Sequence, residues 1–209
     1  MMTDMTMDNF LAVLSSSEPV PGGGGACGYV AAVGMSLGNM VLALTTGKKK
    51  YAEYQEEIEE LIVKATDLTK RLAECMDKDA ESFKPLAAAY GLPKDTEEQI
   101  KEREAIMAKA LVTASVAPLS MMELILEAMK LIDRISVIGS RIAISDAGVG
   151  ITMCEAAMKG ASLNVFINTK LMKDRELAED MNFKADKMLA EAAQIEEETF
   201  GRVMDAVRP

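Results

Sequence analysis

The sequence contains no histidine, and this absence excludes several familiar kinds of active site. Ser-His-Asp and Cys-His catalysis both need an imidazole, and so do histidine-based metal centres. Any acid–base chemistry must therefore come from Asp, Glu, Lys, Tyr or Cys side chains. We expect neither a metal ion nor an organic cofactor.

Tryptophan is also absent, aromatic residues make up only 4% of the chain, and runs of β-branched residues are scarce. Ala, Leu, Met, Glu and Lys predominate, and these residues favour helices. A chain of 209 residues suits a single domain, here residues 1–209. The composition predicts an all-α fold, a bundle of about six to eight helices in which long helices pack antiparallel.

The chain has only three cysteines, and its acidic residues outnumber its basic ones, 33 to 23. Cys27, Cys75 and Cys154 lie far apart, with no CxxC pair and no secretory signal, so we expect reduced thiols in a cytoplasmic protein. The net charge of −10 argues against a nucleic-acid partner, because binding phosphate backbones needs a broad basic surface. A small anionic ligand remains compatible with the sequence if positive charge is concentrated locally.

One segment, "PVPGGGGACGYVAAVGMSLGNMVLALTTGKKKY" (19–51), is uncharged until its three lysines. Its length would allow a membrane span, and it is the one candidate span that the sequence suggests. Polar residues such as Ser36, Asn39 and Thr45 lower its hydropathy. We therefore expect a buried core helix and no membrane contact, with the small residues allowing neighbouring helices to approach closely.

Both ends of this segment could bind an anion. The glycine run can be a flexible helix start or a cradle in which backbone N–H groups face a ligand; its spacing matches neither a Walker A motif nor a dinucleotide-binding fingerprint. The lysines can be a solvated helix start or an anion-binding cluster. The candidate binding residues are Pro21, Gly22, Gly23, Gly24 and Gly25 at one end and Lys48, Lys49, Lys50 and Tyr51 at the other.

Two carboxylates interrupt apolar stripes. A heptad seam continues by steps of four to Asp79 and then Phe83; its members are Tyr51, Tyr54, Ile58, Leu61, Ala65, Leu68, Leu72 and Cys75. Asp146 lies in the same way among Ile142, Val149 and Met153. Buried carboxylates are rare unless they are paired or functional. Each is therefore a candidate catalytic residue, with helix capping or pairing with a cation as the structural alternative.

Helix boundaries follow from local signals. Thr6 with Asn9, and Thr96 with Gln99, predict helix starts, the second through a capping box. Pro85 is predicted to kink or end a helix, and Pro118 is predicted to mark another helix boundary. A last long helix is predicted over 174–208, with a seam of apolar residues along one side.

Six blocks, in order, resemble the cyclodeaminase/cyclohydrolase family: "PVPGGGGACGYVAAVGMSLGNMV", "LTTGKKKY", "DKDAESF", "AYGLPKDT", "AISDAGVG" and "GASLNVFIN". This family includes the C-terminal domain of formiminotransferase-cyclodeaminase and the stand-alone methenyltetrahydrofolate cyclohydrolases. The resemblance implies an all-helical homodimer with a folate site near the dimer interface. It also implies that 5,10-methenyltetrahydrofolate is either hydrolysed to 10-formyltetrahydrofolate or formed from 5-formiminotetrahydrofolate with release of ammonia.

This resemblance suggests roles for the candidate residues. A carboxyl group whose pKa is raised by apolar surroundings could supply the acid or the base, so Asp79 and Asp146 are the candidates for catalysis or for binding the pterin edge. The lysines suit the anionic glutamate tail. Asn164 and Asn168, one helical turn apart, could hydrogen-bond the substrate or only cap and pack. Tyr51 is either a core residue or a polar contact. A non-catalytic helical scaffold or folate-binding protein remains the alternative.

Overall fold

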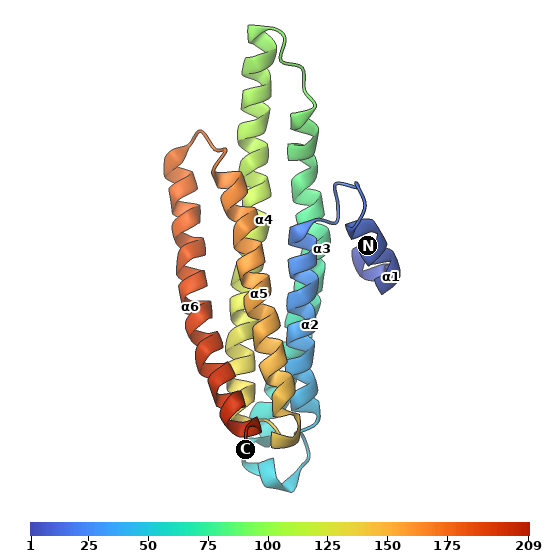
Figure 1. Cartoon of the computed structure of the whole chain (residues 1–209), viewed down its shortest axis with the longest axis vertical. Coiled ribbons are helices and arrows are strands. Elements are labelled where there is room, and N and C mark those ends of the chain that lie inside the picture. The colour runs from blue at the N-terminus through green and yellow to red at the C-terminus, as the bar shows by residue number, and fades with distance from the viewer.

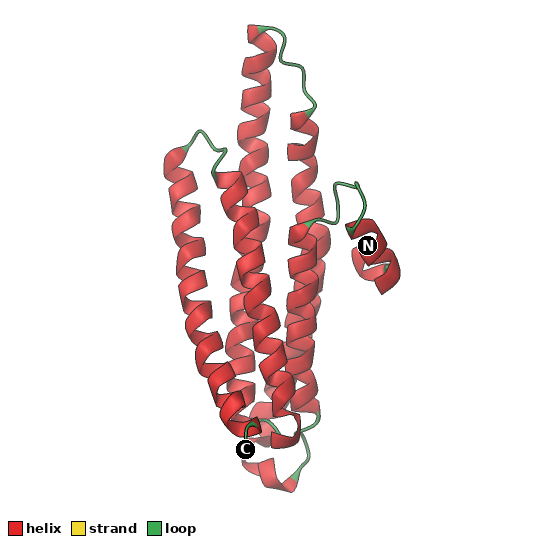
Figure 2. Ribbon diagram, viewed as in Figure 1, coloured by secondary structure: helices red, strands yellow, loops and turns green.

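The computed structural model describes all residues, 1–209, and it contains six α-helices and no strand (Figures 1 and 2). The helices are α1 (Met7–Leu14), α2 (Gly23–Ala43), α3 (Gln55–Tyr90), α4 (Glu97–Ile138), α5 (Ile144–Thr169) and α6 (Arg175–Val207). Three short 3₁₀ turns join them: η1 (Met2–Asp4), η2 (Lys49–Tyr54) and η3 (Arg141–Ala143). The predicted all-α class and number of helices are confirmed.

Side-chain caps start three of the helices. Thr6 Oγ1 accepts the Asn9 N–H at 3.2 Å at the start of α1. Thr96 and Gln99 form the predicted capping box at the start of α4. Asp174 caps α6. Helices α2, α3 and α5 begin without a side-chain cap. Because α2 begins at a glycine run, the N–H groups of its first turn are left for other partners.

Glycines allow the backbones of α2 and α5 to pack very close to each other. A Cβ atom added to Gly34 would lie 2.8 Å from the carbonyl oxygen of Gly150, and one added to Gly150 would lie 2.7 Å from that of Gly34. At the other end of the same pair, Gly23 lies against Asn164, which shows that the two helices run antiparallel. The close approach of helices predicted from the small residues is therefore present within one subunit, between α2 and α5 (Figure 1).

The predicted seam of α3 faces the core. All six of its members from the helix itself are buried: Ile58, Leu61, Ala65, Leu68, Leu72 and Cys75. Tyr51 and Tyr54 were expected on the same helix but belong to η2, because α3 begins only at Gln55. The seam of α6 is confirmed as well, with Met181, Ala185 and Val203 buried against the bundle.

Neither Pro85 nor Pro118 ends a helix, so the helix ends predicted there are wrong. Helix α3 continues through Pro85 to Tyr90, and α4 runs without interruption through Pro118. A proline inside a helix removes one hydrogen bond to the carbonyl four residues earlier. For Pro118 that carbonyl belongs to Ala114, and it accepts a hydrogen bond from Asn168 Nδ2 of α5 at 2.9 Å instead. A neighbouring helix thus supplies the donor that the proline lacks.

The expectation of a single candidate membrane span is also corrected. Both α2 and α4 contain an 18-residue window with a mean hydropathy of 1.5, sufficient by length and composition to cross a membrane. In the bundle, 50% of the α2 window and 44% of the α4 window are buried. Packing within the helical core accounts for the apolar character of both helices.

Candidate active site

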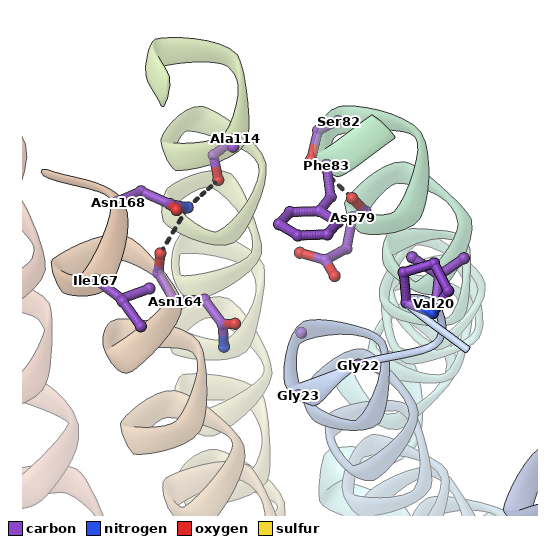
Figure 3. Close-up of a pocket in the computed structure, with 12 residues that line it drawn as sticks. Val20, Gly22, Gly23, Asp79, Ser82, Phe83, Ala114, Asn164, Ile167 and Asn168 are labelled. Carbon is purple, nitrogen blue, oxygen red and sulfur yellow. Dashed lines mark hydrogen bonds between the residues drawn. The ribbon is translucent and has the colours of Figure 1, made fainter. Parts of the chain in front are cut away.

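A cavity of about 260 Å³ lies where α2 begins, between α3, α4 and α5 (Figure 3). Twelve residues line it: Pro19, Val20, Gly22, Gly23, Gly24, Asp79, Ser82, Phe83, Ala114, Asn164, Ile167 and Asn168. Asp79 is the only ionisable residue among them. The chain has no group of three or more His, Cys, Asp or Glu side chains that could hold a metal ion.

Asp79 lies directly on the first turn of α2. A Cβ atom added to Gly24 would come within 2.3 Å of Asp79 Oδ1 and 2.4 Å of its Cγ and Oδ2. Only glycine leaves room for the carboxylate at this place. Burial raises the pKa of Asp79, and the backbone N–H of Gly25 partly opposes that shift. A carboxyl group in such a setting is suited to exchange protons closer to neutrality than an exposed one.

The glycine run faces an anionic group, as expected of a cradle. Within the protomer this group is the carboxylate of Asp79. Gly22 and Gly23 lie at the cavity below Asp79 (Figure 3). Pro21 and Gly25 are buried and do not line it. A helix N-terminus favours negative charge, which is the position Asp79 occupies here. The run positions the carboxylate and leaves an open space beside it.

The two asparagines make different contacts. Asn168 Nδ2 donates to the carbonyls of Ala114 and Asn164, both at 2.9 Å, so both of its N–H groups are used within the fold. Asn164 Nδ2 donates once, to the carbonyl of Gly160 at 2.9 Å, and its side chain points toward Gly23 in the cavity (Figure 3). Asn164 is therefore the asparagine with polar atoms left for a ligand, whereas Asn168 ties α5 to α4.

Several cavity residues were not among the predicted site residues. Phe83 turns its ring into the cavity beside the carboxylate of Asp79 (Figure 3), and Ser82 Oγ donates to the Asp79 carbonyl at 2.8 Å. Ile167, from α5, lines the opposite wall. Phe83 follows Asp79 by four residues and Ile167 follows Asn164 by three. The helical spacing that places such pairs on one face could have identified both.

A second group of predicted residues lies at the far end of α2. It consists of the predicted Lys48, Lys49, Lys50 and Tyr51. Ser140 and Arg141, which were not predicted, lie against them, and we call the six residues the basic end. Lys48 Nζ donates to Ser140 Oγ at 3.1 Å, and the Arg141 N–H donates to Tyr51 Oη at 3.1 Å. That hydrogen bond is the main cause of the lowered pKa of Tyr51, and the neighbouring lysines add to it. The basic end has concentrated positive charge but no cavity of its own among the principal ones.

Asp146 lies in the first turn of α5, on the side of the molecule that carries the basic end. Its expected apolar surroundings are not present within the protomer, because Ile142 is 90% exposed and Val149 is 52% exposed. Asp146 precedes Asn164 by 18 helical residues, a distance of about 27 Å along the axis at ~1.5 Å per residue. The structure therefore separates the predicted residues into two groups, one at each end of the α2–α5 layer.

Comparison with known proteins places this arrangement in a family. The family model described as formiminotransferase-cyclodeaminase matches residues 6–187. A methenyltetrahydrofolate cyclohydrolase of Methylorubrum extorquens is 37% identical over 202 residues, which cover 97% of each chain. The formimidoyltransferase-cyclodeaminase of Mus musculus is 28% identical over 189 residues, 90% of this chain but only 35% of that protein.

A solved structure agrees in fold. The crystal structure of a formiminotetrahydrofolate cyclodeaminase from Thermotoga maritima superposes with a TM-score of 0.81 and 23% sequence identity, covering 99% of this chain and 98% of the other. The helical arrangement described above is therefore shared along the whole chain. Together with the family match over residues 6–187 and the 37% identity to the cyclohydrolase, this shows that the chain belongs to the formiminotransferase-cyclodeaminase family.

Proposed function

We propose that the protein is a folate enzyme that hydrolyses 5,10-methenyltetrahydrofolate to 10-formyltetrahydrofolate. The similarity to the Methylorubrum extorquens cyclohydrolase supports this reaction, because it extends over 97% of both chains. Formation of the methenyl compound from 5-formiminotetrahydrofolate is the second candidate, supported by the family match. The observation that carries the proposal is the single buried carboxylate, Asp79, in an otherwise uncharged cavity.

Charge complementarity favours this substrate. The methenyl bridge of the substrate is an amidinium cation shared between N5 and N10. Asp79 is the only ionisable group lining the cavity, so a cationic ring system would meet a carboxylate and no competing positive charge. In a partly buried site this attraction is less screened than at the surface. The cavity of about 260 Å³ is slightly smaller than the ~300–1,000 Å³ typical of ligand sites, which suits the ring portion better than a whole folate.

One carboxyl group can serve the whole reaction. As water adds to the bridging carbon, Asp79 accepts a proton from it, and a tetrahedral intermediate forms. The protonated carboxyl then returns a proton to N5 while the bond between N5 and the carbon breaks. The hydroxyl on that carbon loses its proton to solvent as its oxygen becomes the carbonyl oxygen, which leaves the formyl group on N10. The net change is the addition of one water and the release of one proton. Because the two nitrogens are part of one molecule, the reacting atoms are already close together.

Other cavity residues orient the ring in this proposal. The ring of Phe83 provides an aromatic surface beside Asp79, on which a flat bicyclic ring can stack. Asn164 offers its side-chain oxygen, since its amide nitrogen already donates to Gly160. Asn168 fixes the wall from which Asn164 projects, so its role is positional.

The proposal includes several features that follow from family membership or composition. We propose a homodimer in the cytoplasm, without a metal or organic cofactor and without nucleic-acid or membrane partners. The free state of Cys27, Cys75 and Cys154 supports a reducing compartment. The net charge of −10 supports the absence of a nucleic-acid partner.

The test is the loss of 5,10-methenyltetrahydrofolate absorbance in a buffer where spontaneous hydrolysis is slow. We expect the protein to accelerate it, Asp79→Asn to lose most of this activity, and Asp186→Asn, an exposed carboxylate on α6, to retain it. If no acceleration is found, 5-formiminotetrahydrofolate is the next substrate to assay. A wild-type protein that is inactive on both, yet is stabilised by folates, would support the non-catalytic alternative. Full activity of Asp79→Asn would remove Asp79 from the chemistry.

A further inference from the structure

Arg103 of α4 is the only arginine in the chain that is half-buried and has no partner. Of the other six, four bind carboxylates or carbonyls through the guanidinium group and two are exposed: Arg71, Arg134, Arg175 and Arg202, and Arg141 and Arg208. The Nε atom of Arg103 is buried and has no hydrogen-bond partner. It is the only buried side-chain donor of this kind, since the other two unpartnered atoms are oxygens. Such groups are rare in folded proteins, and an acceptor on a ligand would explain this one.

The sequence around Arg103 leaves its charge without a carboxylate. The residues three and four positions away on the helix are all neutral: Gln99, Ile100, Ile106 and Met107. These are the positions from which a side chain of the same helix could form an ion pair. Glu104, the next residue, pairs instead with Lys173 from the loop after α5, with 2.6 Å between its Oε2 and the lysine Nζ.

A small cavity of about 180 Å³ lies beside Arg103, where the loop between α5 and α6 meets α4. Its lining consists of Arg103, Glu104, Met107, Ala108, Leu111, Leu171 and Lys173. Because Glu104 and Lys173 neutralise each other, Arg103 gives the cavity one uncompensated positive charge. The rest of the lining is apolar. The cavity therefore has the size and charge for a single anionic group at the end of an apolar surface.

This Arg103 cavity lies on the way out of the Asp79 cavity. Ala114 of α4 lines the Asp79 cavity, and Ala110, Met107 and Arg103 follow at steps of four, three and four, so they share one face of the helix. On the other side, Ile167 lines the Asp79 cavity and Leu171, four residues later, lines the Arg103 cavity. Helix α4 extends well past the end of α5 (Figure 1). The two cavities thus adjoin along the groove between α4 and α5.

Distance and chemistry along this groove match the tail of a folate. Arg103 precedes Ala114 by 11 residues, about 16 Å along the axis at ~1.5 Å per residue. In a folate, a p-aminobenzoyl group separates the reacting nitrogens from the first glutamate. The thioether of Met107 is suited to contact with this aromatic ring. An arginine can bind a carboxylate through two parallel N–H donors, and the unpartnered Nε–H of Arg103 can be one of them.

We propose that Arg103 binds a carboxylate of the first glutamate of the substrate, while the p-aminobenzoyl group lies in the groove along Met107 and Leu171. This inference rests on the proposed function for the identity of the ligand. The role is the one that the sequence suggested for Lys48, Lys49 and Lys50, which lie at the other end of α2 within the protomer. Arg103 holds the tail and takes no part in the chemistry at Asp79.

The test compares two substrates that differ only in the tail: 5,10-methenyltetrahydrofolate and an analogue in which a simple amide replaces the glutamate. Arg103→Gln should raise KM for the first about 10-fold with little change in kcat, and should leave KM for the second unchanged. Arg103→Lys should lie between wild type and Arg103→Gln, because it keeps the charge but not the paired donors. The matched control is Lys101→Gln, exposed on the same helix and turned away from Arg103, and it should behave as wild type.

An equal rise in KM for both substrates overturns the assignment, since the loss would then not involve the glutamate, and so does an unchanged KM for both. If the wild type has no activity on folates, the proposed function fails, and the cavity is then tested with p-aminobenzoylglutamate alone. Saturable thermal stabilisation that Arg103→Gln loses and Lys101→Gln keeps would still establish the anion site. Stabilisation that Arg103→Gln retains, or none in the wild type, would overturn that site as well.

Discussion

Gly24→Ala offers the sharpest test of the site, because a single methyl group would meet the proposed catalytic carboxylate. The added Cβ would lie 2.3 Å from Asp79 Oδ1 and 2.4 Å from Cγ and Oδ2. Ordinary contact begins near 3.4 Å, so the carboxylate must move by about 1 Å. A displacement of ~1 Å at a reacting group costs on the order of 100-fold in rate. We expect kcat/KM for methenyltetrahydrofolate hydrolysis to fall by about that factor.

The fold should survive this substitution. Crowding in a packed region costs about 1–3 kcal/mol, and replacing glycine by alanine inside a helix returns ~0.5–1 kcal/mol. The net cost of about 1–2 kcal/mol would lower the melting temperature by a few degrees, which circular dichroism can follow. The matched control is Gly201→Ala on α6, where an added Cβ meets nothing within 4 Å. We expect it to keep full activity and to gain a little stability.

The refuting result is a Gly24→Ala protein with wild-type kcat/KM and a normal melting curve. The carboxylate of Asp79 would then have moved without consequence, and the reaction would not depend on its position. A variant that loses activity only in parallel with its helical signal would not support the reasoning either, since the loss would then be one of folding.

Three further predictions concern the same region. Burial raises the pKa of Asp79, so the charged form opposes folding once the pH rises through that pKa; Asp79→Asn should therefore melt higher than wild type at pH 7, and this gain should vanish in acid. Asn168→Ala leaves the Ala114 carbonyl without a donor and should lower the free energy of unfolding, measured by urea denaturation, by about 1–3 kcal/mol. The loss should be smaller in a Pro118→Ala background, where the backbone N–H of the new alanine can donate to that carbonyl; equal losses in the two backgrounds would refute this. Phe83→Leu removes the aromatic surface beside Asp79 and should raise KM several-fold while kcat changes little; an unchanged KM would exclude stacking.

Sequence patterns identified the helices well because their causes are local. The capping box at Thr96 and the seam from Ile58 to Cys75 depend on residues within a turn or two of each other. The prolines were misjudged for the opposite reason. Whether Pro118 breaks a helix depends on a donor from α5, 50 residues further along the chain at Asn168, and local rules do not include such a donor.

The candidate site shows the same division. Asp79 was identified as a charge on an apolar seam, and the structure places it in a cavity with Asn164 and the glycine run. The apolar neighbours of Asp146 were identified from the same kind of spacing, yet Ile142 and Val149 are exposed in the protomer. Helical spacing shows which residues share a face. It does not show whether that face is covered by the protomer, by a second copy or by solvent.

The helical class, the helix starts, the absence of histidine chemistry and the residues able to carry charge could all be predicted from the order of the amino acids. These properties follow from composition and from contacts between residues close in the chain. Three features became visible only in the folded chain. Gly24 leaves room for Asp79, Asn168 donates to the carbonyl left free by Pro118, and Asp79 and the basic end lie at opposite ends of one layer. Each of these depends on how helices distant in sequence pack, because only packing fixes which side chains from different helices come within contact distance.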